Sequence, residues 1–234
     1  MFNMPQITVI IPAYNEALSI GKVVAGIPRE LVQQVIVVDN NSTDSTGQVA
    51  TQAGATVVWE PRQGYGQACL TGIAHALNQV PPPDIILFMD GDFSDYPEEI
   101  PLVLHPLLTQ GYDLVIGSRA LGQREPGSMT IPQIFGNWLA TTLLRSLYNA
   151  RFTDLGPFRA ISTQALCQLN MQDRTYGWTV EMQLKAAQQN IRYTEVPVTY
   201  RKRIGVSKIS GTVKGVVLAG YKILWTIGKH YRRK

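Results

Sequence analysis

Short apolar runs alternate with segments of helical periodicity over the first half of the chain. The apolar runs are rich in β-branched residues, which is typical of strands, and they occupy residues 7–11, 35–39, 56–59, 85–90 and 113–118. Helical patterns lie between them, near residues 16–27, 43–53, 66–80 and 97–110. Because strands that are apolar throughout are buried on both faces, this alternation predicts an α/β fold with a mostly parallel sheet and helices on both of its faces.

The pattern changes after residue 119. Residues 122–132 are rich in Gly and Pro and predict a loop. Further helices are predicted near residues 133–149, 162–170 and 178–190. Residues 191–200 predict a late strand, and Pro197 favours the edge of the sheet because proline has no amide to donate to a neighbouring strand.

Residues 212–229 predict a C-terminal amphipathic helix. At 100° per residue its three lysines share one face; they are Lys214, Lys222 and Lys229. The opposite face carries Val216, Ile223 and Ile227, while Tyr221 and Trp225 fall near the lysines. Basic and aromatic side chains on one helix favour the surface of an anionic membrane; the alternative is an ordinary helix packed on the domain. We therefore expect a domain at 1–211 and a basic, membrane-associated tail at 212–234.

The distribution of charge strengthens the membrane interpretation. The chain of 234 residues has a net charge of +4, yet ten basic and no acidic residues follow from Arg201 onward, and the first 200 residues carry a net charge of −6. The positive charge at the C-terminal end of the chain therefore predicts a binding partner. Nucleic acid is not expected, because the sequence has neither a recognition motif nor a basic surface interleaved with aromatic residues.

Composition sets the compartment that we expect. The chain is 45% hydrophobic and 16% charged, which indicates a globular protein. Its two cysteines, Cys69 and Cys167, lie far apart and are typical of a reducing compartment. We find no secretory leader and no apolar run of the roughly 20 residues that a membrane span needs. The expectation is a cytoplasmic protein, peripheral on the cytoplasmic face of a membrane.

Polar segments follow the predicted strands, where a parallel sheet binds its ligands. They are PAYNE (12–16), DNNSTDST (39–46), EPRQGYGQA (60–68), DGDFSD (90–95) and GSR (117–119). Taken alone, DNNSTD is better explained by a turn with a helix cap and RQGYGQ by a Gly-containing loop, and an Asp-x-Asp triplet arises by chance about once in such a chain. Their occurrence at successive strand ends predicts one shared binding site.

In order and spacing these segments resemble glycosyltransferase family 2, whose fold is the nucleotide-sugar-binding GT-A fold. The later segments DLGPFRAI (154–161) and YRKRIGVSKIS (200–210) resemble the branch of dolichyl-phosphate mannose synthases and related polyprenyl-phosphate glycosyltransferases. The resemblance covers roughly residues 5–210. It implies an inverting enzyme that uses a nucleotide sugar and a divalent cation, Mg²⁺ or Mn²⁺.

The resemblance assigns the metal and nucleotide residues. Asp92 corresponds to the metal ligand, and Asp90 to a contact of the ribose or the metal. Ser94 stands where the branch often has glutamine, so Asp95 or water is the expected further ligand. The remaining nucleotide contacts implied are Pro12, Tyr14, Glu16 and Asp39, with Gly64 and Gly66 allowing close approach of the backbone. Asn40 replaces a more usual aspartate, so uracil and guanine both stay open as the base.

The acceptor decides whether the reaction needs a base. A hydroxyl acceptor must lose a proton, whereas a phosphate monoester, with a second pKa of about 6, is already anionic near neutral pH. Base candidates are few, with Asp154 and Glu181 the best placed. Cationic and hydrogen-bonding candidates for an acceptor phosphate are plentiful: Arg119, Arg201, Arg203, Ser207 and Lys208. This asymmetry favours a phosphate acceptor.

The expected function is transfer of a hexose, mannose or glucose, from a GDP- or UDP-linked donor to a polyprenyl or dolichyl phosphate at the membrane surface. The residues expected to act in transfer are Asp92, Arg119, Arg203 and Lys208. The alternatives are a family 2 enzyme with a saccharide or other soluble acceptor, and a non-catalytic nucleotide-binding membrane scaffold. A dinucleotide-dependent dehydrogenase is excluded, because no Gly-rich fingerprint follows the first strand.

Overall fold

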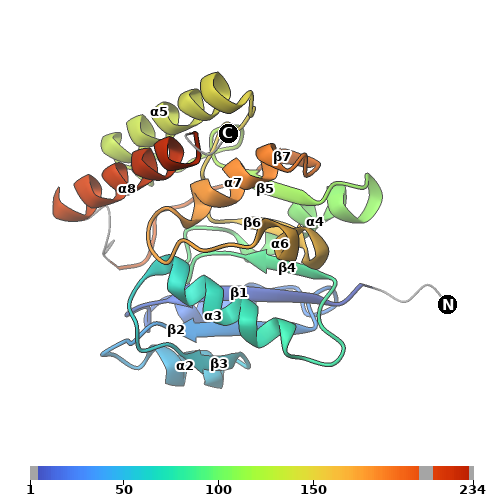
Figure 1. Ribbon diagram of the computed structural model, residues 1–234. Coiled ribbons are helices and arrows are strands. Elements are labelled where there is room, and N and C mark those ends of the chain that lie inside the picture. Colours follow the sequence, from blue (N-terminus) through green and yellow to red (C-terminus); the bar gives the residue numbers. More distant parts are fainter. Residues whose placement is uncertain (1–4, 206–212, 232–234) are drawn as a thin grey trace.

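A computed structural model describes residues 5–205 and 213–231, which build one seven-stranded sheet in the order β3-β2-β1-β4-β6-β5-β7 (Figure 1). The strands are β1 (Ile7–Ala13), β2 (Gln34–Asp39), β3 (Thr56–Trp59), β4 (Ile85–Phe88), β5 (Leu114–Ser118), β6 (Arg159–Ser162) and β7 (Tyr193–Pro197). All neighbouring strands are parallel except at β6, which runs antiparallel between β4 and β5. The α/β fold with a mostly parallel sheet is confirmed.

Helices cover both faces of this sheet. They are α1 (Ile20–Gly26), α2 (Thr46–Gln52), α3 (Tyr65–Leu77), η1 (Pro97–Glu99), α4 (Ile100–Thr109), α5 (Ile131–Tyr148), α6 (Thr163–Leu169), α7 (Trp178–Gln188) and α8 (Val213–Tyr231). Alternate residues of β1 point to opposite faces: Ile10 belongs to a core with α3, α5, α6 and α7, and Val9 and Ile11 to a core with α1, α2 and α4. The continuous apolar pattern of the strands reflects these two cores.

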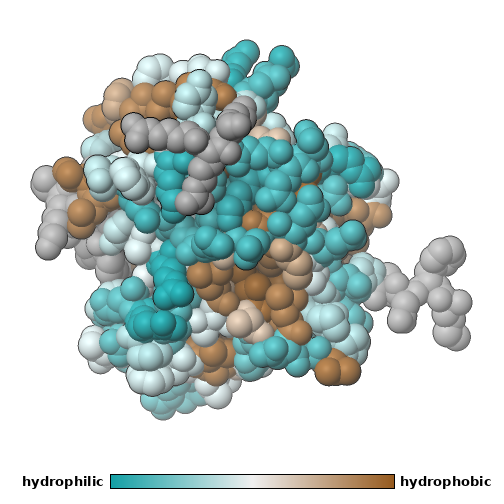
Figure 2. Space-filling view, in the orientation of Figure 1, coloured by the Kyte–Doolittle hydropathy of each residue, from teal (hydrophilic) through white to brown (hydrophobic). Residues whose placement is uncertain are grey.

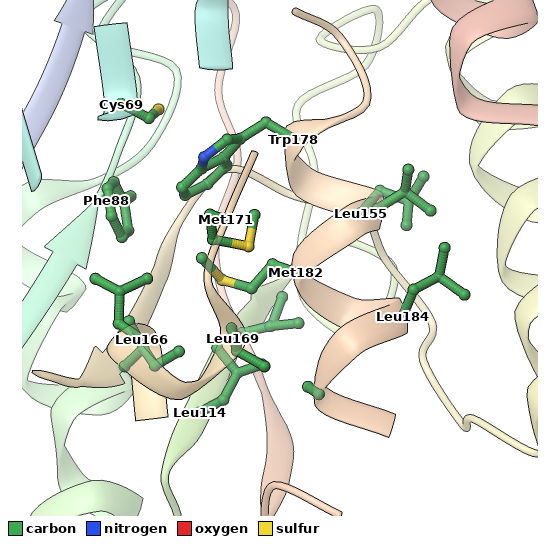
Figure 3. Packing of buried hydrophobic residues seen from close by; sticks show 14 of the residues in the cluster. Cys69, Phe88, Leu114, Leu155, Leu166, Leu169, Met171, Trp178, Met182 and Leu184 are labelled. Atoms are coloured by element: carbon green, nitrogen blue, oxygen red, sulfur yellow. The ribbon is translucent and has the colours of Figure 1, made fainter. Parts of the chain in front are cut away.

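Trp178 is the largest side chain that is fully buried, and it organises the core beneath α7. Its ring meets Phe88 of β4 edge-on at 4.7 Å between centroids. Figure 3 shows Trp178 at the start of α7 with Phe88, Cys69 and Met171 around it. The first turn of α7 is therefore fixed against the centre of the sheet, close to where β4 ends.

One strand, β6, was not predicted. It is only four residues long and begins with Arg159, whose guanidinium is fully buried and donates to the carbonyl groups of Leu155, Gly156 and Thr179. A buried charge at the start of a short segment hides the strand pattern. The strand with Pro197 does lie at an edge, as predicted, because β7 ends the sheet.

Helix α8 packs on α5 and α7, and α5 and α8 lie side by side in Figure 1. Ile227 and Thr226 face the protein and are nearly fully buried, and the Tyr148 hydroxyl donates to the Ile227 carbonyl oxygen at 2.5 Å. Lys222 forms an ion pair with Asp173 at 2.9 Å. The predicted lysine face is therefore partly engaged by the protein, and the aromatic side chains Tyr221 and Trp225 are the exposed ones.

Within the described residues, no helix has the length and apolar character needed to cross a bilayer.

Candidate active site

A cavity of about 310 Å³ lies where the carboxyl ends of β1, β2 and β4 meet the start of α3. This is the edge of the sheet that the polar strand ends predict. Seven of the site residues expected from the sequence line it together: Pro12, Tyr14, Glu16, Gly64, Asp90, Asp92 and Arg203. Segments nearly 200 residues apart in the chain therefore build one pocket.

Both carboxylate oxygens of Asp92, which lines this cavity, have partners. Its Oδ1 accepts hydrogen bonds from the Ser94 amide at 2.9 Å and from the Ser94 hydroxyl at 2.5 Å. Its Oδ2 pairs with Nη1 of Arg203 at 3.1 Å. Ser94 therefore orients the Asp92 carboxylate. It stands at the position where the branch of dolichyl-phosphate mannose synthases often has glutamine.

Asp90 and Asp92 both line the cavity, and their charges act on each other. Burial and the neighbouring charge of Asp92 raise the pKa of Asp90 to about 7, although Arg203 and Arg119 act in the opposite direction. Two close carboxylates are a fitting donor set for Mg²⁺ or Mn²⁺, since both ions prefer oxygen ligands. The described residues offer no cluster of three or more His, Cys, Asp or Glu side chains for a metal. Such an ion would complete its shell with diphosphate oxygens and water, as Mg²⁺ usually does.

Asp95 does not line the cavity. The side chain is 1% exposed, and its Oδ1 has no hydrogen-bond partner among the described residues. Burial, together with the charges of Asp90 and Asp92, raises the pKa of Asp95 well above its usual value. The assignment of Asp95 as a third metal ligand stays a prediction.

Arg203 bridges two strand ends across the cavity. In addition to Asp92 it pairs with Glu16, with 3.0 Å between Nη2 and Oε1. The Ile204 amide donates to the Asp92 carbonyl oxygen at 2.9 Å. The segment that follows β7 is thereby tied to the acidic turn after β4, and the Arg203 guanidinium lies between the carboxylates of Asp92 and Glu16.

Asn40 shapes the opposite wall, a role that the sequence did not reveal. Its Nδ2 donates to the carbonyl oxygens of Glu60 and Arg62, and its Oδ1 accepts from the Gly64 amide at 2.8 Å. A carboxylate could not donate the first two bonds. The preceding Asp39 does not line the cavity: its Oδ1 accepts from the Ser42 amide and fixes the turn after β2.

The cavity also contains residues that no local pattern marks. Gln63 and Tyr65 flank Gly64 in the Gly-containing turn, and Tyr176 arrives from the segment before α7. Gly66 does not line the cavity; a Cβ on it would lie 2.1 Å from the Asp173 carbonyl oxygen. Tyr176 is more than 80 residues from the other lining residues on its amino-terminal side, so only the tertiary structure places it here.

Arg119 is bound to a buried acid. Its backbone amide and Nε donate to Asp154 Oδ2 at 2.7 and 2.8 Å, and its Nη2 donates to Oδ1 at 2.6 Å. Burial acts to raise the pKa of Asp154, but the charge and hydrogen bonds of Arg119 prevail and lower it. The guanidinium also lies over the Tyr200 ring at 5.0 Å. Contact of Arg119 with a phosphate stays a prediction.

Three further residues are expected from the sequence to bind the acceptor phosphate, and the structure describes one of them, Arg201. Arg201 lies between the rings of Phe93 and Tyr96, and its Nε donates to the Phe93 carbonyl oxygen at 2.6 Å. It fixes the loop after β4 and does not line the cavity. Ser207 and Lys208 lie outside the described residues.

A second cavity, of about 380 Å³, lies between α5 and the loop that follows β5. Two exposed arginines, Arg124 and Arg145, line it together with the apolar side chains of Ile134 and Trp138. Asp154 also reaches this cavity. The Arg119–Asp154 pair thus connects the end of β5 with a pocket that is both basic and apolar.

Comparison with known proteins identifies the family of this chain. Glycosyl transferase family 2 matches residues 8–169. An uncharacterized glycosyltransferase of Mycobacterium tuberculosis is 35% identical over 216 residues, which cover 91% of this chain and 94% of that protein. An undecaprenyl-phosphate mannosyltransferase of Micrococcus luteus is 29% identical over 225 residues, 90% of each protein.

A solved structure shows the same fold. Glucosyl-3-phosphoglycerate synthase from Mycobacterium tuberculosis, crystallised with Mn²⁺, UDP and phosphoglyceric acid, superimposes with a TM-score of 0.77 at 23% identity, covering 97% of this chain and 78% of that one. Because the family matches more than half of the chain, and a relative of similar length is 35% identical, this protein belongs to glycosyl transferase family 2.

Proposed function

We propose that this chain transfers a hexose from a nucleotide sugar to a polyprenyl phosphate at a membrane surface, with inversion at the anomeric carbon. The observation that carries the proposal is the cavity in which Asp90, Asp92 and Arg203 meet at the strand ends of a family 2 fold. The bond between the anomeric carbon and the donor's phosphate oxygen breaks, and a bond to the acceptor's phosphate oxygen forms. A nucleoside diphosphate leaves.

The donor's nucleotide would occupy the half of the cavity formed by the ends of β1 and β2. Tyr14 offers an aromatic surface there, and the backbone at Gly64 is open to close approach. The diphosphate would lie toward Arg203, whose planar guanidinium suits bidentate contact with phosphate. Mannose and glucose, and GDP and UDP, all remain candidates for the donor.

Asp90 and Asp92 would hold Mg²⁺ or Mn²⁺, and the ion when bound would neutralise the charge that develops on the leaving diphosphate. Ser94 keeps the Asp92 carboxylate in one orientation, so little ordering remains to be done on binding. Arg203 is positioned to share the charge of the leaving group, because it already spans from Asp92 to Glu16.

A phosphate acceptor is supported by the state of the two base candidates. Asp154 is bound to Arg119, and Glu181 pairs with Lys185 and accepts from the amides of Gln172 and Asp173. Both side chains are buried, and neither lines the donor cavity. An acceptor that is already ionised needs no such base. The named activity of the Micrococcus luteus relative supports a lipid of this kind.

The membrane part of the proposal is supported by one face of the molecule. Large apolar side chains are exposed along two neighbouring helices; they are Ile131, Ile134, Phe135 and Trp138 of α5, and Val217, Leu218, Tyr221, Leu224 and Trp225 of α8. Figure 2 shows hydrophobic surface at the upper left, over these helices. Neither helix contains an acidic residue. Exposed aromatic side chains without negative charge favour the interface of an anionic bilayer, which here would be its cytoplasmic face.

A transfer assay tests the proposal. Radiolabelled UDP-glucose and GDP-mannose are each offered with undecaprenyl phosphate in vesicles, and undecaprenol serves as the matched lipid without phosphate. We expect a labelled lipid with the phosphate only, in the presence of Mn²⁺ and not after EDTA. No lipid product with any hexose donor, or transfer to soluble saccharides alone, would overturn the lipid acceptor; no metal-dependent binding of nucleotide would favour the scaffold.

A further inference from the structure

The short segment of residues 172–177, between α6 and α7, lies between the proposed donor cavity and α8. Tyr176 lines the cavity. On the other side, Asp173 Oδ2 pairs with the ammonium group of Lys222 in α8 at 2.9 Å. We call residues 172–177 the bridging segment. Among the described residues, the bridging segment links α8 to the wall of the donor cavity.

The bridging segment meets the Gly-containing turn of the cavity through backbone contacts. The Gly66 amide donates to the Thr175 carbonyl oxygen at 3.2 Å, and the Gln67 amide donates to the Arg174 carbonyl oxygen at 2.9 Å. A Cβ on Gly64 would lie 2.3 Å from the Arg174 carbonyl oxygen. Such close contacts leave no room for independent movement, so a displacement of the bridging segment must also displace Gly64 and its neighbours.

Asp173 holds the segment in shape while it pairs with α8. Its Oδ1 accepts from the Thr175 amide at 2.8 Å and from the Gly177 amide at 3.2 Å, so one carboxylate fixes the turn and the ion pair at once. The Asp173 amide in turn donates to Glu181 Oε2 at 2.7 Å. Lys222 therefore pairs with the carboxylate of Asp173, which also fixes the backbone before Tyr176.

A second contact links the segment to α8. A Cβ on Gly177 would lie 2.6 Å from the Thr226 hydroxyl and 2.6 Å from Asp173 Oδ2. Thr226 is one turn from Lys222 and is buried at this contact. Helix α8 thus lies against the bridging segment at two successive turns, while the adjacent side of the helix exposes Tyr221 and Trp225.

We infer that Asp173 is a positioning residue: through its pair with Lys222, the seating of α8 sets the shape of the donor cavity at Tyr176 and Gly64. The inference rests on the proposal that this cavity binds the nucleotide of the donor. It gives the C-terminal helix a role in donor binding, in addition to any contact with a membrane.

The test compares binding of UDP and GDP, each with Mn²⁺, by calorimetry without membranes. Lys222→Met removes the charge and keeps most of the side-chain volume, Lys222→Arg keeps the charge, and Lys229→Met is the matched control on an exposed lysine of the same helix. Gly177→Ala disturbs the same contact from the other side. Thermal unfolding is measured for each variant, so that loss of the fold is recognised separately.

We expect Lys222→Met and Gly177→Ala to weaken nucleotide binding by at least about fivefold, the lower range of coupling between sites. Lys222→Arg should restore binding, and Lys229→Met should bind like the parent. In the transfer assay the KM for the donor should rise while the KM for the acceptor stays unchanged. If the parent binds nucleotide and folded Lys222→Met binds it equally well, the inference is wrong and the proposed function stands. If the parent binds neither nucleotide, both fail.

Discussion

Replacing Asp154 with asparagine should destabilise the protein by about 3–5 kcal/mol, because the change leaves the Arg119 guanidinium buried without a counter-charge. The Asp154 carboxylate is 1% exposed and accepts three hydrogen bonds from Arg119, all between 2.6 and 2.8 Å. The Arg119 side chain is itself only 11% exposed. Water therefore has little access to the Arg119 guanidinium and cannot replace the lost carboxylate.

The expected loss is large enough for a simple assay. For a domain of this size each kcal/mol moves the melting temperature by about 2–4 °C, so Asp154→Asn should melt roughly 6–20 °C below the parent at neutral pH. The pKa of Asp154 is lowered in the folded state. The contribution of the pair is therefore present above the carboxyl's unfolded pKa, and the difference between variant and parent should shrink as the solution is acidified below it.

An exposed pair supplies the matched control. Arg192 and Asp113 lie 3.2 Å apart, but their side chains are 66% and 32% exposed. Asp113→Asn should cost no more than about 1 kcal/mol, as exposed pairs do. If thermal unfolding shows Asp154→Asn to be no more destabilising than Asp113→Asn, the reasoning that the buried pair supports the end of β5 is refuted.

Two further predictions concern stability and membrane contact. Burial raises the pKa of Glu60, but hydrogen bonds to its carboxylate outweigh this and lower the pKa to about 2. Glu60→Gln should therefore be less stable than the parent in urea at pH 7, and the difference in stability should shrink as the pH falls from about 5 to about 2. A difference that does not change with pH would contradict this. Replacing Trp138 and Trp225 with serine should weaken binding to anionic vesicles in flotation assays, whereas the same change at Trp59, a comparably exposed tryptophan on β3, should not. Equal effects of all three would contradict a docking face on α5 and α8.

Much of the fold could be predicted from the pattern of apolar positions, because strands buried on both faces leave a clear signal. Strand β6 could not be predicted, because it begins with a charged residue. The guanidinium of Arg159 is buried only because it donates to carbonyl groups of a turn and of α7. The side of α8 that faces the protein was also hidden. Its lysines share a face in projection, but the pair between Lys222 and Asp173 depends on a segment that precedes α7.

The candidate site was predictable where chemistry follows directly on a strand. Tyr14, Asp90 and Asp92 line the cavity because parallel strands end at one edge of the sheet. The same reasoning could not show that Arg119 has a buried partner, 35 positions away. Nor could it place Tyr176, which reaches the cavity through the tertiary contacts of the bridging segment. Partners that are distant in sequence leave no local pattern.

We propose that the acidic turn after β4 binds a metal together with the diphosphate of a nucleotide sugar. Calorimetric titration of the parent and of Asp92→Asn with UDP and GDP, with and without Mn²⁺, tests it most directly, and Asp113→Asn serves as a control remote from the cavity. We expect Mn²⁺ to strengthen binding of one nucleotide to the parent and to Asp113→Asn, and Asp92→Asn to lose this gain while remaining folded. Equal, metal-independent binding by all three proteins would contradict it.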